Sequence, residues 1–109
     1  MVKVIMPLKK KLGVSQKDFN DHWLNNHSQL AAQVIPGLRR YVLSYMVGEN
    51  QEFDGVAELY FNDIASWEKA LHFLTKEDGG QVIRDDNVKF VDIRRIYFLV
   101  TEEKVIKEK

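Results

Sequence analysis

Residues 15–38 have the clearest start and stop in the chain, and they predict one long helix. Ser15, with Asp18 three residues later, is typical of an N-cap, where the hydroxyl accepts an orphan backbone N–H and the acid suits the positive helix end. Pro36 ends the helix, because proline disfavours helical geometry in the residue before it. Apolar side chains at helical spacing form one face of this helix: Phe19, Trp23, Leu30 and Val34.

His27 lies on this apolar face, where a plain core would carry no ionisable group. At roughly 100° per residue it falls between Trp23 and Val34, whereas His22 projects well off the face. A histidine aimed at the interior either has a hydrogen-bond partner in the core or lines a cavity. The pattern leaves both interpretations open. The second makes His27 a candidate site residue, because titratable groups in pockets often carry function.

The composition excludes several classes of protein. The 109 residues suffice for one domain, which we expect over residues 1–101, followed by a charged tail over 102–109. Sixteen basic and sixteen acidic residues cancel, which argues against a nucleic-acid partner. The absence of cysteine excludes disulfides and thiol nucleophiles, and three scattered histidines disfavour a metal site. No apolar run approaches the ~20 residues of a bilayer span, and no signal peptide is evident, so we expect a cytoplasmic protein without a membrane partner.

No motif in the sequence calls for a cofactor. Neither a G-x-G-x-x-G fingerprint nor a P-loop is present, which disfavours a nucleotide site. Haem needs an axial ligand, for which His27 could serve, and a roomy apolar cleft, but no motif requires haem. We therefore expect no cofactor.

The order of predicted elements indicates an α+β fold. Enrichment in β-branched and aromatic residues predicts strands over 2–8, 38–47, 56–61 and 93–101. A second helix starts near Ile64, a loop spans 48–53, and residues 81–87 form a short, irregular helical segment anchored by Phe90 and Val91. The order strand, helix, strand, strand, helix, strand is that of a ferredoxin-like βαββαβ fold. It predicts one four-stranded antiparallel sheet with both helices on one face.

The strands alternate only weakly between apolar and polar residues, although a sheet with one wet face should alternate clearly. Both faces of the predicted sheet therefore look buried. The apolar residues of both parities are Val4, Ile5, Met6, Val42, Leu43, Met46, Val56, Leu59, Ile96, Tyr97, Phe98 and Leu99. We predict a homodimer in which two sheets pack together through the open face or close into a common barrel.

A set of short motifs runs in order through nearly the whole chain. The most specific is Trp23-x3-His27 with Pro36-Gly37 behind it; the others are Gly13-Val14-Ser15, residues 54–59 (DGVAEL), Phe61 and residues 90–92 (FVD). Together they resemble the EthD family, within the wider group of dimeric α+β barrels. The resemblance implies a ferredoxin-like protomer that dimerises into a barrel. Related barrels include cofactor-free monooxygenases, polyketide cyclases and an isomerase, so the fold alone does not settle the function.

The resemblance also implies a site between the sheet and its helices, with His27 at the family's histidine position as a general acid or base. Glu58 is the second catalytic candidate, because a carboxylate in mid-strand is costly if it is dry and unpaired. We expect Glu58 on the dimer face, in an ion pair with Arg40, Arg94 or Arg95; the opposite register would bring it into the pocket of His27. Aromatic residues that form either core or substrate-binding walls are Trp23, Tyr41, Tyr60, Phe61, Trp67 and Tyr97.

Two functions are consistent with these features. The first is an enzyme of small-molecule catabolism or secondary metabolism: a cofactor-independent oxidoreductase such as a monooxygenase, an isomerase or a cyclase. In it, His27 moves a proton on a small oxygenated organic substrate. The second is a non-catalytic dimeric barrel that binds a hydrophobic small molecule or acts as an accessory protein. An enclosed polar and apolar pocket beside His27 favours a ligand site, whereas a His27 sealed in packing favours a structural role.

Overall fold

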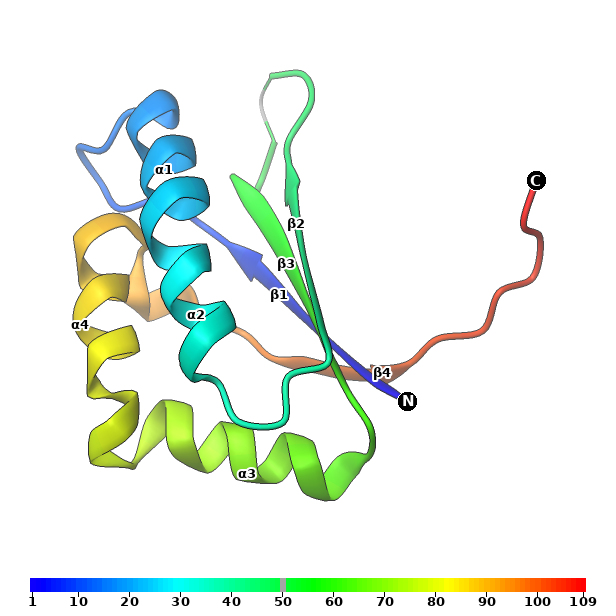
Figure 1. The fold of residues 1–109 in the computed structure, drawn as a ribbon. Coiled ribbons are helices and arrows are strands. Elements are labelled where there is room, and N and C mark those ends of the chain that lie inside the picture. Colours follow the sequence, from blue (N-terminus) through cyan, green and yellow to red (C-terminus); the bar gives the residue numbers. More distant parts are fainter. Residues whose placement is uncertain (50) are drawn as a thin grey trace.

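The computed structural model of the chain describes residues 1–49 and 51–109. A four-stranded antiparallel sheet carries a layer of helices on one face (Figure 1). Its spatial order is β2-β3-β1-β4, with the strands β1 (Val2–Leu8), β2 (Arg40–Tyr45), β3 (Gly55–Phe61) and β4 (Leu99–Glu102). This topology confirms the predicted ferredoxin-like α+β protomer. The loop predicted over 48–53 includes residue 50, which lies outside the described residues.

The first helical run is continuous but contains a π-helical turn. It consists of α1 (Gln16–His22), the π turn (Trp23–His27) and α2 (Ser28–Val34). Ser15 caps it as predicted, since its Oγ accepts a 3.1 Å hydrogen bond from the backbone N–H of Asp18. The uniform helix expected over 15–38 is corrected here, because the N–H of Ser28 donates to the carbonyl of Trp23, five residues back.

Two further helices complete the layer, α3 (Ile64–Thr75) and α4 (Gln81–Phe90). The α4 helix is regular and longer than the irregular segment expected over 81–87, and its buried Phe90 is the predicted anchor. Across the described residues, none of the helices has the length and apolarity needed to cross a membrane.

The last predicted strand, over 93–101, is partly wrong. Ile93–Arg95 is a 3-10 turn, and the strand begins only at Leu99. The Oδ1 of Asp92 accepts a 3.1 Å hydrogen bond from the backbone N–H of Arg94, which favours the turn over an extended chain. The second strand is also shorter than the predicted 38–47, since it ends at Tyr45.

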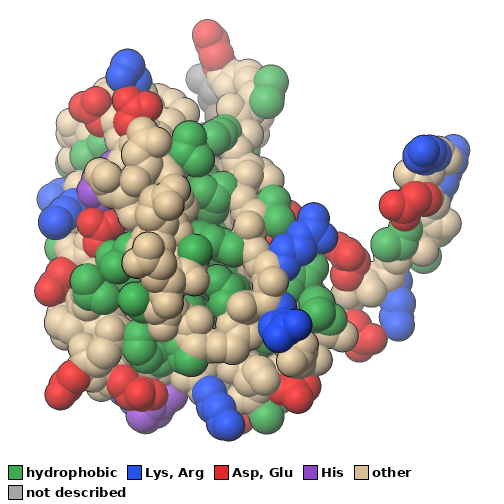
Figure 2. All heavy atoms as spheres, viewed as in Figure 1, with side chains coloured by type: hydrophobic (Ala, Val, Ile, Leu, Met, Phe, Trp, Pro, Cys, Tyr) green, Lys and Arg blue, Asp and Glu red, His purple; other side chains and the backbone are tan. Residues whose placement is uncertain are grey.

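The hydrophobic core lies between the sheet and the helices. Register pairs Val4 with Leu59 and Leu59 with Tyr41, so alternate residues of these three strands face the helices. The largest fully buried side chains are Val4, Phe19, Trp23, Leu59, Phe61 and Phe90. Figure 2 shows hydrophobic side chains gathered between the first helix and the sheet, with charged groups toward the outer rim. The core therefore joins the two layers and surrounds the site described below.

The other face of the sheet has no helix over it (Figure 1). Ile5, Val42 and Val56 are half-buried on this face, and Leu99 of the edge strand is 50% exposed. A single protomer thus leaves apolar strand residues facing outward, as the weak alternation of the sequence predicted.

Gly55 permits close contact between the sheet and the first helix. A Cβ built on Gly55 would lie 2.7 Å from Cη2 of Trp23 and closer still to Cζ3. We predict that Gly55→Ala lowers the free energy of unfolding by about 1–3 kcal/mol, because the overpacked indole has to move. Urea unfolding measures this change. The same substitution in a Trp23→Phe background should be less costly, and an equal cost there would contradict the contact.

Candidate functional site

The site is built around a buried carboxylate, Asp86, on α4. Its Oδ2 accepts a 2.7 Å hydrogen bond from Nδ1 of His27, and both residues are only 8% exposed. The neutral imidazole that fits this bond carries its proton on Nδ1, which leaves a lone pair on Nε2. No hydrogen bond reaches that Nε2 within the described part of the chain. His27 therefore has a fixed orientation and a basic nitrogen that remains available.

His22 binds the same carboxylate. Its Nε2 lies 3.0 Å from both Oδ1 and Oδ2 of Asp86, and its Nδ1 accepts a 3.2 Å hydrogen bond from the side-chain amide of Asn26. In a regular α-helix, positions five residues apart lie about 140° apart around the axis. The π turn, whose hydrogen bonds span five residues, brings His22 and His27 to the same side. The sequence predicts that His22 projects well off the apolar face, whereas the structure brings it beside His27 on Asp86.

Packing and electrostatics both hold this cluster in place. The Phe90 ring lies 5.0 Å from the His27 ring and 4.8 Å from the His22 ring, measured between centroids. Burial lowers the pKa of His27, and Asp86 opposes this shift. Burial alone would raise the pKa of Asp86, but hydrogen bonds from His27 and His22 outweigh it and keep that pKa below its ordinary value. At neutral pH the pair is thus a carboxylate and a neutral imidazole.

His27 also lines a cavity of about 340 Å³ between the sheet and the helices. This volume lies within the range typical of small-molecule sites. Apolar side chains make up most of the lining; those from the sheet and the segment before β4 are Met6, Leu8, Tyr41, Ala57, Leu59, Ile93, Ile96 and Phe98. His27 thus combines the two interpretations that the sequence left open: its Nδ1 has a hydrogen-bond partner, and its side chain lines a cavity.

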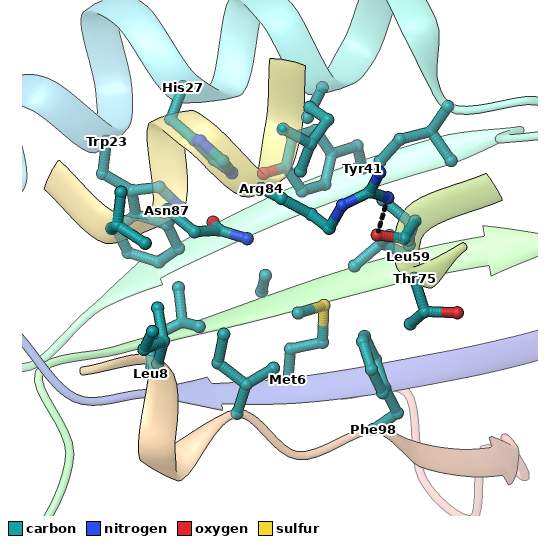
Figure 3. A pocket seen from close by; sticks show the side chains of 18 residues that line it. Met6, Leu8, Trp23, His27, Tyr41, Leu59, Thr75, Arg84, Asn87 and Phe98 are labelled. Carbon is teal, nitrogen blue, oxygen red and sulfur yellow. Dashed lines mark hydrogen bonds between the residues drawn. The ribbon is translucent and has the colours of Figure 1, made fainter. Parts of the chain in front are cut away.

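Three polar side chains lie together on one side of the cavity. Figure 3 shows His27 from the first helix and Arg84 and Asn87 from α4 on that side, opposite Met6 and Leu8 of β1. No side-chain hydrogen bond engages the Asn87 amide within the described residues. In the same part of the chain, no group of three His, Cys, Asp or Glu side chains could hold a metal ion. The arrangement suits an organic ligand with oxygen atoms along one edge.

The predicted aromatic residues separate into three groups. Trp23 and Tyr41 line the cavity, and burial raises the pKa of Tyr41 to about 12. Phe61 and Trp67 pack against each other in the core, with their ring centroids 5.5 Å apart, and do not line the cavity. The remaining two do not line the cavity either: Tyr60 is buried on the open face of the sheet, and Tyr97, 45% exposed, lies beside Phe53.

Glu58 lies on the open face of the sheet, the face on which the sequence predicts it. Its neighbours in β3, Ala57 and Leu59, face the cavity instead, so His27 and Glu58 are not brought together in one protomer. The carboxylate forms an ion pair with Lys3, not with an arginine as predicted. Lys3 also donates a 2.9 Å hydrogen bond to Glu103.

The arginines expected to pair with Glu58 have other contacts. Arg40 lies over the Tyr60 ring, Arg94 pairs with Asp92, and Arg95 pairs with Glu52. The prediction of an ion pair was correct for Glu58, but the partner was not, because β1 lies directly beside β3 and brings Lys3 next to this carboxylate.

The sequence pattern predicts only a short, irregular helical segment over 81–87, and for this reason it does not identify Asp86, Arg84 and Asn87 as site residues. One signal was present. Ile83, Asp86 and Phe90 recur at helical spacing, which places a carboxylate on the buried face of α4. A buried acid needs a partner, and the buried His27 was the complementary group.

The fold and cavity define a ferredoxin-like α+β protein with a histidine–carboxylate pair between its layers. The EthD domain model matches residues 11–94, and the chain belongs to the EthD family. An EthD family protein from Bacillus halodurans C-125 is 27% identical, with a TM-score of 0.73, over 95% of this chain and 99% of that chain. No curated protein matches the chain at a significant level.

Two more distant structures share the fold. A dimeric protein of unknown function with a ferredoxin-like fold, from Bacteroides fragilis, is 10% identical, with a TM-score of 0.66, over 94% of this chain and 95% of that chain. The cofactor-independent oxygenase SnoaB from Streptomyces nogalater is 13% identical, with a TM-score of 0.64, over 98% of this chain and 97% of that chain.

The lowered pKa of His27 predicts acid sensitivity. Between that pKa and the unfolded value of 6.5, the unfolded chain binds a proton on His27 that the native protein does not bind. Stability from this group is therefore complete above pH 6.5 and is lost as the pH falls through this window, at no more than about 1.4 kcal/mol per pH unit.

Urea unfolding at pH 7.5 and pH 5.5 tests this prediction. His27→Gln should flatten the difference between the two pH values. The groups that face His27, namely Asp86 and His22, remain in that variant. An identical pH dependence in the wild type and His27→Gln would rule out His27 as the source.

Proposed function

We propose that the protein is a cofactor-independent enzyme in which His27 acts as a general base or acid on a small oxygenated organic substrate. The observation that carries this proposal is the 2.7 Å hydrogen bond between Asp86 and Nδ1 of a histidine that lines a cavity. It leaves Nε2 as the available proton acceptor. The cofactor-independent oxygenase with the same fold is consistent with such chemistry.

Asp86 supports proton transfer in two ways. Its hydrogen bond fixes the imidazole tautomer, so that the lone pair lies on Nε2 and not on Nδ1. Its negative charge also stabilises the imidazolium that forms when Nε2 takes a proton. The lowered pKa of His27 keeps the base neutral, and ready to accept a proton, at neutral pH.

One proton transfer can begin each of the expected reactions. His27 removes a proton from an acidic C–H or O–H group and leaves an enolate or phenolate in the cavity. In an isomerase or cyclase, the imidazolium returns the proton at another atom, and no co-reactant is needed. In a monooxygenase, molecular oxygen would oxidise the anion of a CH2 group: a C–O bond forms, the O–O bond breaks, one oxygen atom remains as a carbonyl, and the other leaves as water with the two hydrogens of that carbon.

A second candidate function is ligand binding without turnover. The predominantly apolar lining favours it, since such a surface holds a hydrophobic molecule without further chemistry.

Glu58, on the opposite face of the sheet, does not add a second acid to the cavity of its own protomer. We assign Glu58 and Lys3 to the dimer face instead.

We further propose a homodimer that covers this face. Ile5, Val42 and Val56 lie there without a helix to cover them, and one related fold is described as dimeric. Two copies placed sheet to sheet would remove this apolar surface from water, whereas a single protomer leaves it exposed to solvent.

The catalytic proposal predicts the effects of two substitutions. On any substrate that the wild type converts, such as a lactone or a hydroxylated aromatic compound found by screening, His27→Gln should lower kcat by about 100-fold or more. Asp86→Asn should lower kcat by a smaller factor, because the amide keeps the position of Nδ1 but loses the charge. Steady-state kinetics measure both changes.

His72→Gln is the matched control, since His72 is an exposed histidine on α3 that pairs with Glu77 outside the cavity. It should leave kcat unchanged. Undiminished turnover in a folded His27→Gln variant would contradict the acid–base proposal. Tight ligand binding without conversion of any screened compound would favour the binding function.

The dimer proposal predicts that Val42→Lys dissociates the protein. A lysine there lies beside Glu58 within the protomer, so the protomer tolerates it, but a dimer would bury its charge. We expect the dissociation constant to rise about 100-fold, corresponding to a penalty of ~3 kcal/mol. Light scattering at micromolar concentration measures the mass.

Ala32→Lys, at an exposed position of α2, is the control and should remain dimeric. A wild-type protein that scatters as a single protomer would refute the sheet-to-sheet dimer.

A further inference from the structure

We propose that the ligand of this cavity carries an anionic oxygen, such as a carboxylate or an enolate, and that Arg84 determines this specificity. The inference rests on the proposed function, since it names the substrate class for the same cavity. Arg84 lines the cavity together with His27. Among the 18 lining residues, it is the one whose side chain is always charged at neutral pH.

The contacts of Arg84 do not neutralise its charge. Its Nη1 donates to the carbonyls of Leu74, at 2.9 Å, and Phe73, at 3.3 Å. Its Nη2 donates to the carbonyl of Glu77, at 2.8 Å, and to the side-chain oxygen of Gln81, at 3.0 Å. All four acceptors are neutral oxygens. Within the described residues, no carboxylate forms an ion pair with Arg84, and its Nε–H makes no hydrogen bond.

These contacts have a structural role, because they satisfy carbonyls at the end of α3. They do not account for the charge on the cavity wall. A cation next to apolar side chains is unfavourable unless water or an anion meets it, and an anion in a low-dielectric cavity binds more strongly than in water. Asp86 is bound to His27 and His22 and does not line the cavity.

The guanidinium is also fixed before a ligand arrives. Gly80 allows its approach, because a Cβ on Gly80 would lie 3.0 Å from Nη1 of Arg84 and would collide with the carbonyl oxygen of Phe73. Four hydrogen bonds to nearby acceptors restrict the long side chain further. A cation held in this way binds an anion with little additional loss of side-chain entropy.

A second group favours an acceptor-rich ligand. Trp23 lines the cavity and is fully buried, and its indole N–H lies near the Tyr41 hydroxyl without a well-aligned hydrogen bond to any acceptor in the part of the chain described. Buried donors without an acceptor are uncommon in native proteins. Trp23 would bind a neutral or an anionic oxygen, whereas Arg84 distinguishes the two by charge.

The test compares two probes of nearly equal shape, benzoate and benzamide, by isothermal titration calorimetry at pH 7.5. Benzoate carries the charged carboxylate, and benzamide replaces it with a neutral amide. We expect the wild-type protein to bind benzoate at least about tenfold more tightly, as one charge-assisted contact allows. Equal affinities, tighter binding of benzamide, or no saturable binding of benzoate would overturn the proposal.

Arg84→Gln assigns the preference to this residue. It should remove the advantage of benzoate and leave benzamide binding within about twofold, since the neutral amide gains nothing from the charge of Arg84. Arg94→Gln is the control: Arg94 is exposed, pairs with Asp92 and does not line the cavity, so the preference should remain. A preference that persists in folded Arg84→Gln would overturn the assignment. The wild-type comparison needs no substitution, so it decides the ligand charge even if Arg84→Gln does not fold.

This experiment separates the two proposals. It measures binding alone, so it does not depend on turnover. Loss of the benzoate preference with intact His27-dependent turnover would refute only the anionic ligand. A benzoate preference in the wild type, together with undiminished turnover in His27→Gln, would refute only the acid–base function.

Discussion

The arrangement of the helical layer depends on one buried carboxylate. Asp86 of α4 accepts hydrogen bonds from His27 and His22 of the first helix, so it joins two elements that are far apart in the sequence. A carboxylate buried without partners would be strongly unfavourable, and each histidine offsets part of that cost. Phe90, one turn further along α4, packs against both imidazole rings. The same contacts that join these helices also orient His27 toward the cavity.

The π turn makes this double contact possible. It closes with a hydrogen bond from Ser28 to Trp23, and it brings His22 and His27 to one side of the helix. Turns of this kind are often found at functional sites, because they reorient a side chain within an otherwise regular helix. Here the reorientation gives one carboxylate two imidazole partners and leaves the Nε2 atom of His27 available.

The two faces of the sheet have different roles. The face toward the helices supplies the apolar floor of the cavity, including Met6 and Leu59. The other face carries the Lys3–Glu58 ion pair among half-buried aliphatic residues. Strand alternation separates the two sets, because neighbouring residues point to opposite sides. Ligand chemistry and association between copies can therefore change independently within one small domain.

The sequence by itself determined the order of elements, the cap at Ser15, the family and the position of His27 on an apolar face, since each depends on local spacing and residue type. Tertiary structure alone decided the partners. Asp86 meets His27 only because α4 packs beside the first helix, and the same packing brings Arg84 to the cavity. Lys3 meets Glu58 only because β1 lies next to β3. Local periodicity records which side of an element faces inward. It does not show which distant side chain contacts that inward face, because this contact depends on how the layers are packed.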